Sequence, residues 1–124
     1  IDALYKIKDS YNVDALAQAV ALAAVKDRAH FASTVAKVVA SRGKLTAELR
    51  ARGWDVPESH ANFLFARPPA PFKADDLFAK LRENNVFVRY FPGEKTGDRL
   101  RITIGTPQQN ARFLSVLDHL TGRK

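Results

Sequence analysis

The stretch LRITIG, residues 100–105, alternates apolar and polar side chains around a single arginine. Alternation of this kind predicts a β-strand with one buried face. Because successive strand side chains point to opposite faces, the apolar residues should pack inward and leave Arg101 and Thr103 on the other side. Arg101 then has two possible roles. It is either a solvated arginine on an exposed sheet face or a receptor whose planar guanidinium binds a carboxylate through two parallel hydrogen bonds.

Two further strands are expected beside this one. VFVRYF, residues 86–91, precedes it, and the glycine-containing loop 92–98 is too short for a parallel crossover, so the two strands should form an antiparallel hairpin. ANFLFAR, residues 61–67, is bounded by Pro68 and Pro69 and predicts a third strand. Its apolar content suggests burial on both faces.

Helical spacing of apolar residues covers much of the remaining chain. Residues 1–11 look like the end of a helix followed by a connector. Asn12 or Asp14 can then cap a helix from Ala15 to about Val25. The segment from Asp27 to Arg52 is expected to be one long amphipathic helix.

The long helix should bury one face. Its apolar residues at three- and four-residue spacing are Phe31, Val35, Val38, Val39, Leu45 and Leu49. Gly43 is a point at which it could break, and Gly53 should end it. A helix over about 75–83 and a last helix from Gly105 or Thr106 complete the order. The set predicts an α/β (α+β) two-layer sandwich, in which helices cover a small sheet of about three strands with an antiparallel hairpin.

Composition narrows the class of protein. A chain of 124 residues with 46% apolar residues suits one globular domain. The sequence contains no cysteine, which excludes disulfides and thiolate chemistry within it and fits a reducing compartment, so a cytoplasmic location is expected. The net charge of +7 is spread along the chain, and its densest basic run, Arg50-Ala51-Arg52, is expected to be solvated at a helix end.

We expect the chain to be a piece of a longer protein. We also expect this piece to contain no membrane span. The most apolar run, Ala15–Val25, is shorter than the ~20 residues that a span requires. No signal peptide or lipidation motif is recognised. The sequence contains no methionine, so Ile1 is not an initiator residue.

Motifs for several common chemistries are missing from the sequence. His30, His60 and His119 are far apart and lack metal-ligand spacing, so no metal site is expected. No glycine-rich phosphate loop, nucleophile elbow or pair of acid and base carboxylates stands out.

Four short motifs, taken together and in order, resemble a known family. They are DSYNV at 9–13, SHANFLF at 59–65, VR at 88–89 and LRITIGT at 100–106. On these residues the chain resembles the C-terminal small domain of the histidinol-phosphate aminotransferases, which are fold-type I, class I/II pyridoxal-phosphate enzymes. The resemblance covers essentially the whole chain. It implies that residues 1–12 are the end of a large domain and a linker, and that residues 13–124 are the small domain.

The resemblance also implies roles for single residues. Arg101 falls on the family arginine that binds the substrate α-carboxylate, and Arg89 falls on the arginine that helps to bind the phosphate of histidinol phosphate. Asn62 falls near the family's active cleft, with no contact assigned to it. The Schiff-base lysine and the other cofactor ligands fall in the large domain, so no catalytic or cofactor-binding residue is expected in this chain.

The whole enzyme would, by this resemblance, transfer an amino group from histidinol phosphate to 2-oxoglutarate in histidine biosynthesis. The products would be imidazole acetol phosphate and glutamate, with pyridoxal phosphate as the electron sink. The small domain would partner the large domain of the same polypeptide in a homodimer, without nucleic acid or membrane. The isolated chain is expected to fold, to bind no cofactor and to be inactive.

Alternatives stay open at this stage. A related aminotransferase acting on aromatic or other amino acids would share the Arg101 motif. Residues 87–90 fit the end of an RNA-recognition strand motif, so a basic RNA-binding module is a second possibility. A third is an interaction domain that binds an anionic partner at Arg89 and Arg101.

Arg89 has three aromatic neighbours in the sequence, Phe87, Tyr90 and Phe91. At least two of the three are expected to be core residues.

Overall fold

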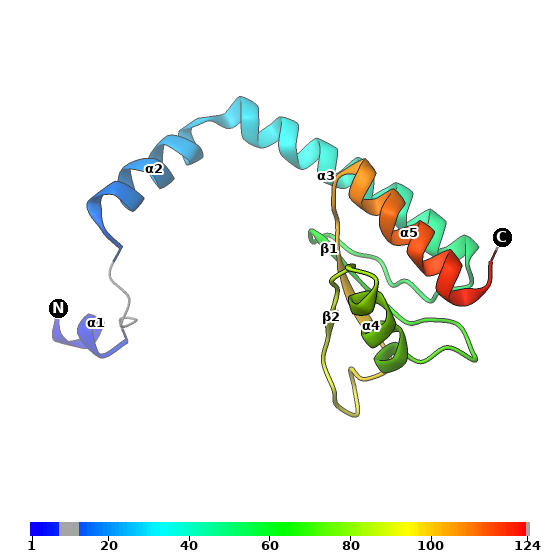
Figure 1. The fold of residues 1–124 in the computed structure, drawn as a ribbon. Coiled ribbons are helices and arrows are strands. Elements are labelled where there is room, and N and C mark those ends of the chain that lie inside the picture. The colour runs from blue at the N-terminus through cyan, green and yellow to red at the C-terminus, as the bar shows by residue number, and fades with distance from the viewer. Residues whose placement is uncertain (8–12, 124) are drawn as a thin grey trace. The chain divides into compact units, whose positions relative to one another are not determined.

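The computed structural model describes residues 1–7 and 13–123, which form five helices and three strands (Figure 1). In chain order the elements are α1 (Asp2–Ile7), α2 (Ala15–Lys26), α3 (Arg28–Ala51), β1 (Phe63–Ala66), α4 (Ala74–Glu83), β2 (Arg89–Tyr90), β3 (Leu100–Thr103) and α5 (Pro107–Thr121). Their contacts divide the chain into two units, Ile1–Val35 and Ala36–Lys124. Residues 8–12, which hold most of the DSYNV motif and of the expected connector, lie outside the described residues.

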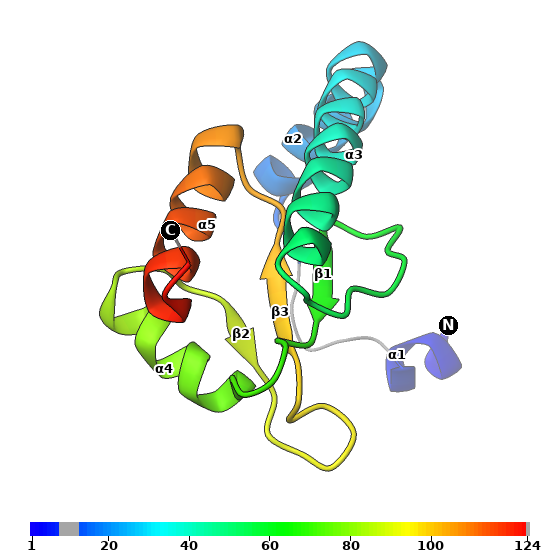
Figure 2. The same cartoon turned by 90° about the vertical axis from the view of Figure 1, so that its right-hand side faces the viewer.

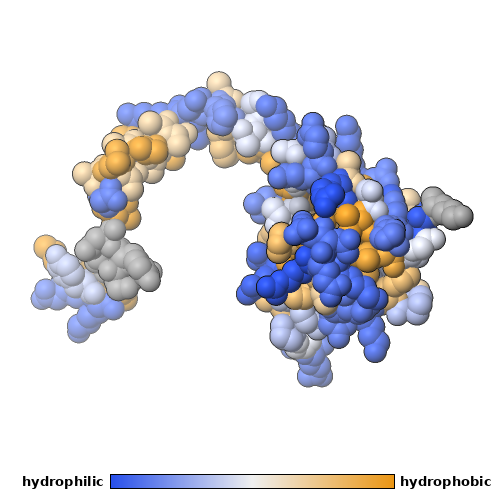
Figure 3. All heavy atoms as spheres, viewed as in Figure 1, coloured by the Kyte–Doolittle hydropathy of each residue, from blue (hydrophilic) through white to orange (hydrophobic). Residues whose placement is uncertain are grey.

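The first unit has helices whose apolar side chains are exposed. α2 begins where predicted, because the Asp14 side chain accepts a hydrogen bond from the Ala17 N–H at 2.8 Å and so caps the helix. The other candidate cap, Asn12, lies outside the described residues. α2 buries none of its residues, and the exposed fractions of Leu16 and Val25 are 74% and 66%. Figure 3 shows apolar side chains on the surface of α2.

α3 runs through Gly43 without a break, so the interruption considered there does not occur. Its C-terminal part supplies Leu45 and Leu49 to the core, as predicted. Val38 also packs partly against the core, whereas the prediction of burial is wrong for the other three members of the face. The exposed members of that face are Phe31, Val35 and Val39. Gly53, with a φ of 81°, ends the helix in the left-handed conformation that glycine adopts readily.

β3 is the central strand of a three-stranded antiparallel sheet and lies between β1 and β2 (Figure 2). Its Leu100 and Ile102 are buried. Arg101 is half-buried and Thr103 is exposed on the opposite face. The alternation predicted from the sequence is therefore confirmed, and so is the antiparallel pairing of β2 with β3.

Both flanking strands differ from their predictions. β1 buries one face instead of two, because Leu64 and Ala66 are buried while the residues that alternate with them are only half-buried. β2 is reduced to Arg89–Tyr90. The backbone N–H of Val86 donates to the carbonyl of Leu81 at 2.9 Å and thereby closes the end of α4, so the chain joins the sheet later than predicted.

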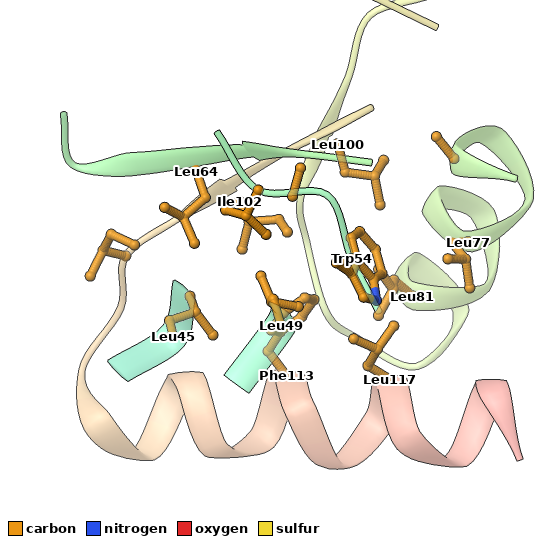
Figure 4. Close-up of a cluster of buried hydrophobic side chains, with 14 residues drawn as sticks. Leu45, Leu49, Trp54, Leu64, Leu77, Leu81, Leu100, Ile102, Phe113 and Leu117 are labelled. Carbon is orange, nitrogen blue, oxygen red and sulfur yellow. The ribbon is translucent and has the colours of Figure 1, made fainter. Parts of the chain in front are cut away.

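The core lies between the inner face of the sheet and the helices α4, α5 and the end of α3 (Figure 4). Trp54, on the connection that follows α3, is buried in the same cluster. The largest fully buried side chains are all leucines: Leu45, Leu49, Leu64, Leu77, Leu81, Leu100 and Leu117. A sheet covered on one face by helices is the two-layer architecture that the sequence predicts.

The junction of β3 with α5 is held by two sets of hydrogen bonds. Thr106 caps α5, since its side chain accepts from the Gln109 N–H and the Gln109 side chain accepts from the Thr106 N–H. The Asn110 side chain accepts from the Gly105 N–H at 3.0 Å and donates to the Gly105 carbonyl at 3.1 Å. The end of the strand is thereby fixed to the first turn of the helix.

Arg52 forms ion pairs with other residues of this chain. The sequence instead predicts a solvated position for the whole run 50–52. Its Nε and Nη2 each lie 2.8 Å from one carboxylate oxygen of Asp118, and this bidentate pair joins the end of α3 to α5. Glu48 also accepts from Arg52, at 2.6 Å. The hydrogen bond from Arg52 lowers the pKa of the Asp118 carboxyl, and the same pair raises the pKa of Arg52.

Asp118→Asn should lower the free energy of unfolding at pH 7 by about 1–2 kcal/mol, because the variant keeps the shape but loses the charge-assisted pair. Since the pKa of Asp118 is lowered in the folded state, its contribution is complete above about pH 5 and is lost as the pH falls below about 4. The variant should therefore show less acid destabilisation than the parent chain.

Denaturant unfolding between pH 7 and pH 3 measures both effects. The matched control is Asp76→Asn, which removes an exposed pair with Lys80 at 2.8 Å and should cost less than about 0.5 kcal/mol. Equal losses in the two variants would contradict a structural role for the Arg52 pair.

Candidate functional site

The outer face of the sheet, opposite the core, carries the two arginines singled out in the sequence. Arg101 of β3 is the direct cross-strand partner of Arg89 in β2 and of Phe65 in β1. Directly opposed residues on an antiparallel pair project to the same face. The sheet thus brings Arg89 and Arg101 together, although eleven other residues separate them in the sequence.

Aromatic rings hold these two guanidinium groups. The Cζ atom of Arg101 lies 5.4 Å from the ring centroid of Phe63 and 5.5 Å from that of Phe91. The Cζ atom of Arg89 lies 5.3 Å from the same Phe91 ring. Cation–π contacts use the flat face of a guanidinium, so its in-plane N–H groups stay available for an anion.

The other two arginines of this face are neutralised by carboxylates. Arg99 pairs with Asp55 at 2.9 Å, and Arg67 pairs with the same carboxylate at 3.1 Å. Asp98 lies within ion-pair distance of both arginines. This end of the sheet therefore has a compensated charge network.

Arg89 and Arg101, by contrast, have no ion-pair partner among residues 1–7 and 13–123. Two like charges directly opposite on neighbouring strands destabilise a sheet. The Nε atom of Arg101 is also buried, and no hydrogen-bond acceptor among the described residues reaches it. Because Nε is closed off, an incoming carboxylate would have to pair with the two terminal nitrogens. The arrangement could accept an anion from outside this part of the chain.

The remaining candidates from the sequence have simpler positions. The Asn62 side chain is exposed, while its backbone carbonyl accepts from the Ile104 N–H at 2.8 Å and extends the pairing of β1 with β3. His60 is exposed and lies 3.4 Å from Glu58. No three side chains of the metal-ligating types gather in the described part of the chain.

The aromatic residues around Arg89 differ from the expectation that at least two belong to the core. Only Tyr90 packs on the core side, where its ring lies 5.7 Å from that of Phe78. Phe87 is 75% exposed. Phe91 lies against the arginines instead. Sequence reasoning missed Phe91 and Phe63 as site residues, although alternation places Phe63 on the outer face of its strand.

The arginine pair lies outside two hollows in the surface of the described residues. One hollow, of about 340 Å³, lies beside the start of α5 and is lined by residues such as Phe87, Thr103 and Asn110. The other, of about 780 Å³, is lined largely by the loops 67–75 and 93–98. Arg89 and Arg101 line neither hollow. The described residues therefore supply one wall of a site.

The described lysines lack the surroundings of a covalent cofactor site. A lysine that forms a Schiff base is activated by desolvation or by a neighbouring cation. Every lysine in the described residues is exposed: Lys6, Lys26, Lys37, Lys44, Lys73, Lys80 and Lys95. The described residues thus do not fit a pyridine-aldehyde cofactor.

No helix within residues 1–7 and 13–123 is both long enough and apolar enough to cross a membrane.

Sequence comparisons with known proteins identify one family. The sequence matches the family described as aminotransferase class I and II over residues 1–117. It is 48% identical over 120 residues to histidinol-phosphate aminotransferase 1 of Trichormus variabilis, across 97% of this chain and 34% of that protein. It is also 48% identical over 123 residues to histidinol-phosphate aminotransferase 2 of Rhizobium meliloti, across 97% and 35% respectively.

Solved structures share the fold. The histidinol-phosphate aminotransferase from Clostridium acetobutylicum superposes with a TM-score of 0.83 at 21% identity, over 98% of this chain and 37% of that one. At this identity the likeness concerns the fold alone. The chain spans about a third of the length of the curated relatives that it matches.

Removing the charge of Arg101 should not weaken the fold. Arg101→Leu removes a buried donor without an acceptor and relieves the repulsion from Arg89, so the free energy of unfolding should stay the same or rise by about 1 kcal/mol. Arg99→Leu breaks a compensated pair and should lower it by about 1 kcal/mol. Denaturant unfolding of the two variants makes the comparison. A larger loss in Arg101→Leu than in Arg99→Leu would identify Arg101 as a structural residue.

Proposed function

Because the chain belongs to the class I and II aminotransferase family, we propose that it is the C-terminal small domain of a histidinol-phosphate aminotransferase. The proposed reaction is transfer of the amino group of histidinol phosphate to 2-oxoglutarate, which gives imidazole acetol phosphate and glutamate. The observation that carries the proposal is the pair of opposed arginines, Arg89 and Arg101, without a carboxylate partner in the described chain.

Both substrates of this reaction are anions, which is what such a pair of arginines requires. 2-Oxoglutarate carries two carboxylates, and histidinol phosphate carries a phosphate ester in place of the α-carboxylate. Arg101 is proposed to bind the α-carboxylate of 2-oxoglutarate and glutamate, because its planar fork matches two carboxylate oxygens. Its half-buried place on the central strand limits its movement and favours one orientation of the substrate.

Arg89 is proposed to contribute to binding of the phosphate. It is exposed at the edge strand, where a bulkier tetrahedral group can reach it. A phosphate monoester carries up to two negative charges and is well matched to two neighbouring guanidinium groups. The distinction between the substrates therefore rests mainly on Arg89.

The cofactor implied by the family, pyridoxal phosphate, is proposed to bind in the large domain of the same polypeptide. The exposure of every lysine in the described residues supports this placement. Residues 1–12 would be the end of that domain and a linker, and residues 13–124 the small domain. A homodimer in the cytoplasm is the proposed setting, and the isolated chain is proposed to bind no cofactor and to be inactive.

Two other assignments have less support. An aminotransferase of the same family acting on aromatic or other amino acids would use Arg101 in the same way, and the 48% identity to two histidinol-phosphate aminotransferases favours the narrower proposal. An RNA-recognition module has a four-stranded sheet in the order βαββαβ, whereas the described residues form three strands.

Arg101→Lys in the whole enzyme should raise the KM for glutamate and for 2-oxoglutarate by about tenfold or more. An ammonium group keeps the charge but loses the second parallel hydrogen bond, a loss of ~1–3 kcal/mol for a charge-assisted contact. Steady-state kinetics with both substrates measures the effect. Unchanged values for both would overturn the assignment of Arg101.

Arg89→Ala should reduce kcat/KM for histidinol phosphate much more than for 2-oxoglutarate, because only the former carries a phosphate. The difference should be about tenfold or larger, the size expected when a charged contact is lost. Half-reaction kinetics with each substrate separates the two values. Equal losses would point to a different amino donor or to a structural role for Arg89.

A further inference from the structure

We infer that Phe91 is a positioning residue for both substrate-binding arginines, and this inference rests on the proposed function. Its ring is the one aromatic group in the described chain that lies against both guanidinium groups, at 5.3 Å from the Cζ of Arg89 and 5.5 Å from that of Arg101. Its role is to hold two like charges side by side on the sheet without neutralising either.

The need for such a residue follows from the charges. A carboxylate can fix an arginine on a sheet, as Asp55 pairs with Arg99 on this same face. A carboxylate beside Arg89 and Arg101 would compete with the substrate for the same N–H groups. An aromatic ring attracts the guanidinium through its negative face and leaves the in-plane donors free. Phe91 can therefore orient the arginines while the anion site remains empty.

Phe91 is itself held in place. It follows β2 directly, and its backbone carbonyl accepts a hydrogen bond from the Thr96 hydroxyl at 2.9 Å. The loop is closed beyond it, since the Gly97 N–H donates to the Gly93 carbonyl at 2.8 Å. The half-buried ring therefore has a fixed backbone beneath it.

Phe63 differs from Phe91 because its ring contacts Arg101 alone, at 5.4 Å. Phe65 differs from both, since the guanidinium against its ring is that of Arg99, at 6.0 Å, which already has Asp55 as a partner. The outer face thus offers three phenylalanines whose rings lie against two, one and none of the substrate-binding guanidinium groups, since Phe65 neighbours Arg101 in the strand pairing but has the Arg99 guanidinium against its ring. These residues form a matched series for testing the inference.

The test compares Phe91→Leu, Phe63→Leu and Phe65→Leu in the whole enzyme loaded with its cofactor. Phe91→Leu should raise the KM for both histidinol phosphate and 2-oxoglutarate by about tenfold, with kcat changed less than about twofold, because orientation of both arginines is lost while their charges remain. Phe63→Leu should affect mainly 2-oxoglutarate. Phe65→Leu should change neither KM by more than about twofold.

Phe91→Tyr and Phe91→Met separate the aromatic face from simple packing. Tyrosine keeps the ring and should restore both KM values to within about twofold of the parent, whereas methionine fills a similar volume without a π face and should behave like leucine. Equal KM values in Phe91→Leu and Phe65→Leu, or full activity in Phe91→Met, would overturn the inference.

The proposed function is tested separately by turnover of histidinol phosphate in the parent enzyme. If the parent instead uses another amino donor, the proposed function fails, and the same variants measured with that donor and its oxo-acid still decide the role of Phe91. Thermal unfolding midpoints of the three leucine variants provide the structural readout. A positioning role would be contradicted if the rise in KM among the three variants followed the loss in unfolding midpoint, and not the number of substrate-binding guanidinium groups that each ring contacts.

Discussion

The two faces of β3 impose the constraint on which the rest of this chain depends. Leu100 and Ile102 must be buried for the sheet to pack on its helices, and because side chains alternate along a strand, their burial makes Arg101 face outward. A slip of one residue would place a guanidinium in a core built of leucines, at a cost of several kcal/mol for an unpaired buried charge. The same hydrophobic contacts therefore set both the packing of the sheet and the outward position of Arg101.

Charge is distributed unevenly along the outer face of the sheet. At one end, Asp55 and Asp98 compensate Arg67 and Arg99, and these pairs hold the loops around β1 and β3 together. At the other end, phenylalanine rings replace carboxylates. Since a ring cannot neutralise a cation, that end keeps its positive potential for a ligand. The separation lets one sheet face serve both stability and binding.

Features with a local cause could be predicted from the sequence. Alternation in residues 100–105 gave the central strand and the orientation of Arg101, and the Thr106-Pro107 pair gave the start of α5. Features that depend on contacts across the fold could not. The partner of Arg52 lies on another helix, and the length of β2 depends on the hydrogen bond from Val86 to the end of α4.

The candidate site shows the same limit. The motifs in the sequence identified both arginines, but the ring that they share became visible only once β2 and β3 were paired. The apolar face of α3 was overestimated for a related reason. Periodicity reports which side chains lie on one side of a helix, and it does not report how far the core reaches along that side.

The connection between β3 and α5 is tightly packed. A Cβ added at Gly105 would lie 2.8 Å from the side-chain oxygen of Gln109, and Asn110 already binds both backbone groups of this glycine. The strand that carries Arg101 and the helix behind it must then move together. The Asp118 pair with Arg52 in turn fastens α5 to the end of α3, so the arginine-bearing strand has a continuous braced support behind it.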